Sequence, residues 1–242
     1  MNKETVKMKP ILFNTPMVQA ILEGRKIATR RIADINTDIT CNDGTTGHEF
    51  VPDNFNPLHV KPTGFVCRRC GFGVAPPHSR VPCGSSLFRP RYWPGDILYV
   101  RETWGNYSFD DPESNAAYFM YRADFPDDAK GYWYEPEQIH FCGFPRWRPS
   151  IHMPKEAARI FLRVTNVRVE RLQAITADEC PMEGVWPLYA GPIGEREAYY
   201  KGAFARLWDS TIKPTDLPAY GWEANPWVWV IRFERCEKPQ GG

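Results

Sequence analysis

The stretch Glu23-Gly24-Arg25-Lys26-Ile27-Ala28-Thr29-Arg30-Arg31 decides how the rest of this sequence is interpreted. It places four cations, one carboxylate and one hydroxyl within nine residues, between a helical pattern and an extended one. Before it, Thr15 is suited to an N-cap and Pro16 to a first helical position, and Gly24 is suited to end the helix. After it, the weak alternation of residues 27–32 predicts a strand.

A strand at this position separates neighbouring side chains onto two faces. Thr29 and Arg31 would share one face, and Ala28 and Arg30 the other. On residue types alone, the favoured interpretation is a solvated basic edge strand, since Lys and Arg protect sheet edges from aggregation. The functional alternative requires Lys26 to meet Thr29 across the turn before the strand.

Three other segments accompany this stretch: residues 9–14, 94–104 and 225–231. Together with Ile-Leu-Glu-Gly-Arg-Lys-x-x-Thr-Arg-Arg they resemble ASCH-domain proteins, a branch of the PUA-like superfamily, and in particular its longer phage and prophage members. The resemblance covers both ends of the chain and is interrupted by insertions. It implies an α+β fold in which a PUA-like β-barrel is flanked by helices.

The same resemblance implies a discontinuous domain organisation. Residues 1–33 and 92–238 would form the barrel domain, and residues 239–242 a tail. Residues 34–91 would be an insertion, because they are rich in Gly, Pro, Asn and Thr and have no helical periodicity.

Composition limits the function classes. The chain has 242 residues and a net charge of +1, so a nucleic-acid contact must come from local basic patches. The aromatic share is 14%, with nine Trp, which favours large core rings or exposed stacking surfaces. A signal-peptide core and a long apolar run are both missing from the sequence, which predicts a cytoplasmic protein of a bacterial host cell and no membrane partner.

Seven cysteines, an odd number, argue against a disulfide framework in such a compartment. The insertion contains Cys67-x-x-Cys70-Gly71, which is typical of a zinc knuckle. We expect a structural Zn²⁺ to organise this segment, with His48, His59 and His78 as substitute ligands and a loop with reduced thiols as the alternative. The predicted zinc ligands are Cys41, Cys67, Cys70 and Cys83.

Some small ASCH-domain proteins are amidohydrolases that deacylate N4-acylated cytidine. The resemblance assigns their functional residues to Lys26 as base, Thr29 as nucleophile and Glu183 as acid. A Thr hydroxyl needs a base to take its proton, and a lysine can be that base where desolvation or nearby cations lower its pKa. Ile27 and the large insertions depart from the small enzymes.

The competing class is a binding module without catalysis, and it is the function we place first. Lys26, Arg30 and Arg31 would then contact phosphate, and aromatic rings would hold a base of a nucleic acid or modified nucleoside. A third class is a phage protein that binds a host protein through the aromatic loop 124–148, including Trp133. The predicted base-binding residues are Arg25, Arg30, Arg31, Glu102, Trp104 and Trp147.

A prediction for Glu102 comes from the strand pattern of residues 97–104. It would share a face with Leu98 and Val100, so its carboxylate needs a Lys or Arg partner.

Overall fold

The computed structural model describes residues 8–33, 50–52, 65–67, 90–108, 117–125, 146–186 and 189–239. The strands in these ranges are β1 (Met8–Leu12), β2 (Ala28–Ile32), β3 (Phe50–Pro52), β4 (Phe65–Cys67), β5 (Ile97–Arg101), β6 (Trp104–Ser108), β7 (Ala117–Tyr121), β8 (Phe161–Arg171) and β9 (Trp227–Cys236). The α-helices are α1 (Thr15–Leu22), α2 (Glu179–Met182), α3 (Arg196–Asp209) and α4 (Leu217–Tyr220). Short 3-10 turns lie at Arg122–Asp124, Ser150–His152, Lys155–Ala157, Leu172–Ala174, Ile193–Glu195 and Pro214–Asp216.

The main sheet is mixed and has the strand order β1-β5-β8-β9-β2. Strands β1 and β5 pair in parallel, whereas β5 with β8 and β2 with β9 pair antiparallel. The α+β prediction is confirmed. Among the described strands the order is linear, from β1 to β2, and no pairing closes the sheet into a barrel.

The chain divides into two compact units, which we describe separately. The first contains residues 1–26, 97–163 and 235–242. Its buried core is formed by Ile97, Trp104, Met153, Ala157, Ala158 and Phe161. In this unit β6 and β7 form an antiparallel pair, and the side chain of Gln19 in α1 donates to the Ala123 carbonyl at 3.2 Å.

In residues 98–104 of this unit, every second side chain is buried. Leu98, Val100, Glu102 and Trp104 are all buried, as their shared face predicts. The extended run is nevertheless divided into β5 and β6 at Glu102 and Thr103, rather than continuing as one strand.

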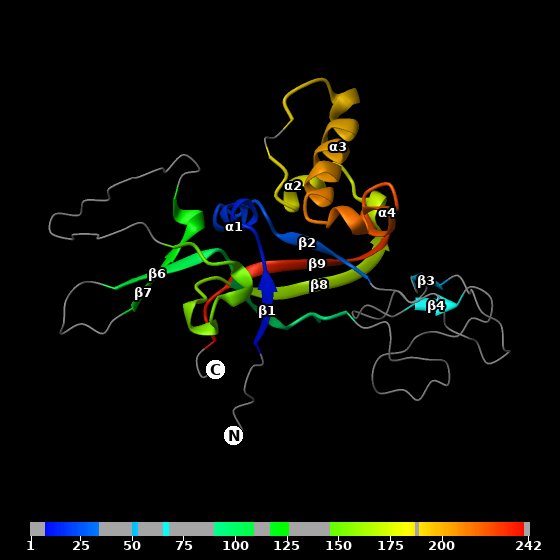
Figure 1. Cartoon of the computed structure of the whole chain (residues 1–242). Coiled ribbons are helices and arrows are strands. Elements are labelled where there is room, and N and C mark those ends of the chain that lie inside the picture. Colours follow the sequence, from blue (N-terminus) through cyan, green and yellow to red (C-terminus); the bar gives the residue numbers. More distant parts are fainter. Residues whose placement is uncertain are drawn as a thin grey trace. The chain divides into compact units, whose positions relative to one another are not determined.

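The second unit contains residues 27–96 and 164–234. Helices α2, α3 and α4 gather beside the strands β2, β9 and β8 (Figure 1). The core between them consists of Leu172, Ile175, Ala177, Cys180, Val185, Tyr200, Phe204, Trp208, Val228 and Val230. Helix α3 contributes Tyr200, Phe204 and Trp208, whose spacing of four places them on one helix face. The strand β9 lies between β8 and β2, an interior position that agrees with its nearly continuous apolar sequence.

Candidate functional site

Helix α1 ends at the turn that leads to Lys26. Gly24 has a φ of +76°, a left-handed conformation that a glycine adopts without strain, and its N–H donates to the Ile21 carbonyl at 3.1 Å. The predicted helix end is therefore confirmed. The start differs, because Asn14 rather than Thr15 is the N-cap and accepts from the Met17 N–H at 3.0 Å.

Two adjacent cations after this turn have different environments. The Arg25 guanidinium pairs with the exposed Glu23 carboxylate, with Nε 2.6 Å from Oε2. Lys26, in the first unit, is only 1% exposed, and its Nζ lies 5.5 Å from the centre of the Phe13 ring. A lysine is almost never buried to this degree unless it is paired, and this burial sets Lys26 apart from the neighbouring Arg25.

Strand β2 carries Thr29 and Arg30 in the second unit. Thr29 is opposite Ile231 and Arg30 is opposite Val230, in register with β9. The alternation of a strand places their side chains on opposite faces, as predicted. Strand β2 is at the edge of the described sheet, as expected from residue types alone, but Thr29 and Arg30 are buried, so the prediction that this edge is solvated is wrong.

The Arg30 guanidinium is surrounded by carboxylates. Its Nη2 lies 2.5 Å from Glu170 Oε1 and 2.7 Å from Glu179 Oε2, and its Nη1 lies 3.0 Å from Glu183 Oε1. The Arg30 side chain is 1% exposed. These distances are those of strong, charge-assisted hydrogen bonds.

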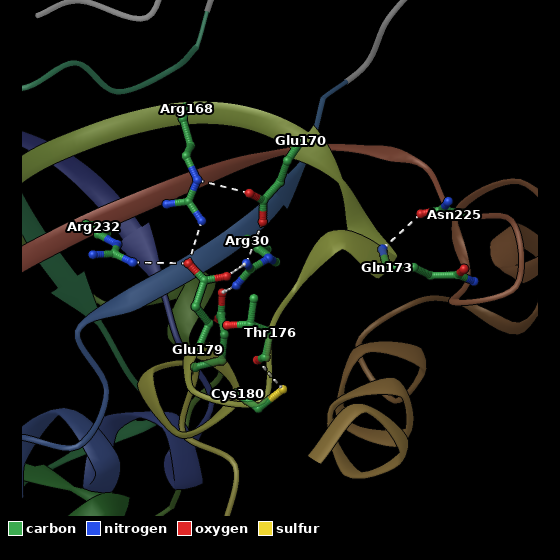
Figure 2. Close-up of polar contacts among 10 residues, drawn as sticks. Arg30, Arg168, Glu170, Gln173, Thr176, Glu179, Cys180, Asn225 and Arg232 are labelled. Atoms are coloured by element: carbon green, nitrogen blue, oxygen red, sulfur yellow. Dashed lines mark hydrogen bonds and ion pairs between the residues drawn. The ribbon is translucent and has the colours of Figure 1, made fainter. Parts of the chain in front are cut away.

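Two further arginines join the same carboxylates from β8 and β9. Arg168 donates to Glu170 at 2.9 Å and to Glu179 at 2.6 Å, and Arg232 donates to Glu179 at 3.1 Å. Figure 2 shows Glu179 between the three guanidinium groups. We call this group the Arg30 cluster; its members are Arg30, Arg168, Glu170, Glu179, Glu183 and Arg232.

The electrostatics of the cluster keep Arg30 and Glu179 charged. Burial alone would lower the pKa of Arg30, but Glu183 and Glu170 outweigh it and raise this pKa. Burial would raise the pKa of Glu179, but Arg30 and Arg168 outweigh it and lower this pKa. Three guanidinium groups face three carboxylates, so the cluster is close to neutral as a whole.

This arrangement argues against the prediction that Arg30 contacts phosphate. Its two Nη atoms are already bound to three carboxylates in a buried environment, and a phosphate would have to displace them. Arg31 differs, since burial lowers its pKa and it lies on the other face of β2. Among the sequence-predicted residues, the structure brings together Arg30 and Glu183.

Thr176 and Glu179 have the spacing of a capping box, but no capping box is formed. The N-cap of α2 is Asp178, and no side chain caps the helix. The Thr176 carbonyl instead accepts from the N–H groups of Glu179 and Cys180 at 3.1 and 3.2 Å. The Glu179 carboxylate is used by the arginines, because three charge-assisted hydrogen bonds are stronger than a single cap.

Glu102, in the first unit, has the partner that its position requires. Its carboxylate, in a side chain that is 1% exposed, receives Arg159 Nε at 3.0 Å and Arg159 Nη2 at 3.1 Å. Burial nevertheless outweighs Arg159 and raises the pKa of Glu102. Arg159 also pairs with Asp124 at 2.7 Å and lies 3.9 Å from the centre of the Tyr121 ring. The bidentate geometry indicates a structural ion pair.

The two tryptophans predicted to hold a base lie in the first unit. Trp104 is buried in its core, with the Phe119 ring 5.8 Å away. Trp147 is half-buried and meets the Phe125 ring edge-on at 5.4 Å. Trp133 of the aromatic loop lies outside the described residues.

The zinc prediction also falls largely outside the described residues. Cys41, Cys70 and Cys83 are not among them, and neither are His48, His59 and His78. The backbone of Cys67 ends β4, which pairs antiparallel with β3 in register Phe50 to Cys67. Within the described ranges, no group of three or more His, Cys, Asp or Glu residues is placed to hold a metal ion.

The ion-pair partners of Arg30 and Glu102 were not identified from the sequence. A signal existed for two members of the Arg30 cluster, since Arg168 and Glu170 are charged residues two positions apart on one face of a long strand. Arg232 and Arg159 gave none, because single arginines at the ends of apolar runs are common surface residues.

The comparisons with known proteins found no match among family models, curated proteins or solved structures. In the described part of the chain, every helix is too short or too polar to span a lipid bilayer.

Proposed function

We propose that this chain binds a modified nucleobase, free or within a nucleic acid, through residues 26–31, and that its sheet is that of an ASCH-type, PUA-like protein. The observation that carries the proposal is the burial of polar groups. Lys26, Thr29 and Glu183 are 1%, 3% and 4% exposed. Burying such groups is costly, and they cluster at functional sites more often than elsewhere.

The charge balance favours a planar, uncharged ligand over a phosphate at this position. The Arg30 cluster has equal numbers of guanidinium and carboxylate groups, so it offers no excess positive charge. Within the second unit, the hydroxyl of Thr29 and the carboxylate of Glu183 are groups that can recognise the donors and acceptors of a base edge.

The test is calorimetric titration with cytidine, N4-acetylcytidine and other base-modified nucleosides. We expect Lys26→Met, which keeps the side-chain length but removes the ammonium, to weaken binding at least tenfold. The matched control is Arg206→Met, at an exposed position of α3. Failure of every nucleoside to bind to the unmodified chain would refute the proposal.

A second candidate is the amidohydrolase, favoured by the burial of both Lys26 and Thr29. Thr29 Oγ would attack the acyl carbon of an N4-acylated cytidine while Lys26 accepts its proton. Glu183 would protonate the departing amine, and water would then hydrolyse the acyl-threonine.

Thr29→Val separates the two candidates. It replaces the hydroxyl with a methyl group of similar size, so it should abolish hydrolysis detected by mass spectrometry and retain most nucleoside binding. Arg30→Ala cannot separate them, because it removes the cation from three carboxylates and is expected to disturb the fold.

A further inference from the structure

Residues 146–155 of the first unit form a basic segment. They include the cations Arg146, Arg148 and Lys155 and no acidic residue. All three side chains are exposed. In the described ranges no carboxylate pairs with any of them, in contrast to Arg30, Arg159 and Arg168.

The backbone of the basic segment is held in place. The N–H and carbonyl of Arg148 form two hydrogen bonds with the backbone of Trp104, at 2.7 and 3.2 Å. Arg101 Nη2 donates to the Ile151 carbonyl, and the Glu102 N–H donates to the Sδ of the buried Met153 at 3.2 Å. The exposed cations are thus presented from a fixed backbone, which lowers the entropic cost of binding.

Aromatic rings accompany these cations. Trp147, between the two arginines, is half-buried against Phe125. The Arg148 guanidinium lies 5.1 Å from the centre of the Trp104 ring.

We propose that the basic segment binds the sugar–phosphate backbone of a single-stranded nucleic acid. Arg146, Arg148 and Lys155 contact phosphates, and Trp147 stacks on a base. Alternating cations and aromatic rings are typical of single-strand binders, because the charges follow the backbone and the rings accept any base. This inference rests on the proposed function, and it supplies the phosphate contacts that Arg30 does not make.

The experiment measures fluorescence anisotropy of labelled oligo(U) and oligo(dT) with the full chain over a range of salt concentrations. The test variant is Arg146→Glu with Arg148→Glu. The control is Arg206→Glu with Lys213→Glu, two exposed positions of the second unit that change the net charge equally. A neutral pair, Arg146→Gln with Arg148→Gln, covers the case in which the charge reversal unfolds the chain.

We expect the test variant to bind at least tenfold more weakly than the control. Loss of two phosphate contacts should also make the negative slope of log K against log salt shallower by about 1.4, because each contact on a single strand contributes about 0.7 to its magnitude. A preference for oligo(U) or oligo(dT) would identify the strand as RNA or DNA, and either preference supports the inference.

Equal loss in the control, or unchanged binding in both the Glu and Gln variants, would overturn it. The inference would also be overturned if polyglutamate displaced the labelled oligonucleotide as strongly as unlabelled oligonucleotide does. That result would indicate an acidic protein as the partner. Nucleoside binding measured on the same variants should be unchanged. If nucleosides fail to bind at all while oligonucleotide binding still depends on Arg146 and Arg148, the proposed function fails and this inference stands.

Discussion

Arg30 Nη1 donates to Glu183 Oε1 at 3.0 Å, joining two residues that are 153 positions apart in the chain. Arg30 lies in β2, and Glu183 follows the last residue of α2. The same guanidinium also binds Glu170 at the end of β8. One buried cation therefore connects two strands and a helix of the second unit, in addition to its place in the functional proposal.

Replacement of Arg30 by Met should destabilise the protein by about 3–5 kcal/mol, because it leaves buried carboxylates without their cation. Methionine has a similar length, so loss of packing should contribute little. The free energy of unfolding from urea denaturation measures the effect. Arg206→Met, at an exposed position, should change it by less than about 0.5 kcal/mol. Equal values for the two variants would show that the Arg30 cluster contributes nothing to stability.

Glu179 predicts an acid-sensitive component of stability. Its pKa in the folded state lies below the usual 4.5, since Arg30 and Arg168 outweigh the effect of burial. The folded state therefore binds this proton less tightly than the unfolded state. The contribution of ionised Glu179 to the free energy of unfolding is complete above about pH 4.5. It is lost as the pH falls through the lower folded-state pKa of Glu179.

Urea denaturation at a series of pH values tests this expectation. Glu179→Gln should be less stable than the original chain at pH 7, and the difference should shrink steadily below about pH 4.5. A difference that stays constant down to pH 3, well below about 4.5, would contradict the lowered pKa.

The elements that the sequence predicted well are those with a strong local signal. The end of α1 at Gly24 is the clearest case, because a left-handed residue favours glycine, and it is found where it was expected. The interior position of β9 agrees with its apolar run, and the buried aromatic residues of α3 recur every four positions. The end of β5 was less clear, because the strand is interrupted at Glu102 and Thr103 without a proline or glycine at either position to mark it.

The candidate site was predictable only in part. Burial of Glu102 and its need for a cation follow from the alternation of its strand, but nothing in the sequence identifies Arg159, 57 residues later, as that cation. Likewise Thr176 and Glu179 have the spacing of a capping box, and three distant arginines compete successfully for the carboxylate. Long-range ion pairs carry no local pattern, so single-sequence reasoning cannot find them.

Glu102 and Arg159 should behave as a coupled pair. Arg159→Met should be strongly destabilising, by about 3 kcal/mol or more, since it leaves a buried carboxylate unpaired. The double variant Glu102→Leu with Arg159→Met should recover much of this loss, because it removes both charges and fills the space.

A double-mutant cycle on unfolding free energies gives the coupling. We expect the two single effects to be non-additive by about 1–3 kcal/mol. Additive effects would mean that the bidentate contact does not stabilise the fold. Lys201→Met with Glu197→Leu, an exposed pair within α3, is the control and should show a coupling of about 0.5 kcal/mol or less.

Cys180 should resist alkylation while the chain is folded. Burial raises the pKa of its thiol to about 12, and its Sγ lies 3.3 Å from the Thr176 carbonyl oxygen. The thiolate is the nucleophile, so at pH 8 only about one Cys180 side chain in ten thousand is reactive, and that one is inaccessible. Treatment with iodoacetamide followed by peptide mass spectrometry should leave Cys180 unmodified in native protein and modify it fully in urea.

The variant Arg30→Met supplies the internal comparison. If loss of the Arg30 guanidinium loosens the core around α2, Cys180 should become modified in buffer alone. Rapid modification of Cys180 in the unaltered chain would instead mean that α2 opens readily, and that the carboxylates of Glu179 and Glu183 are not held by Arg30 in solution.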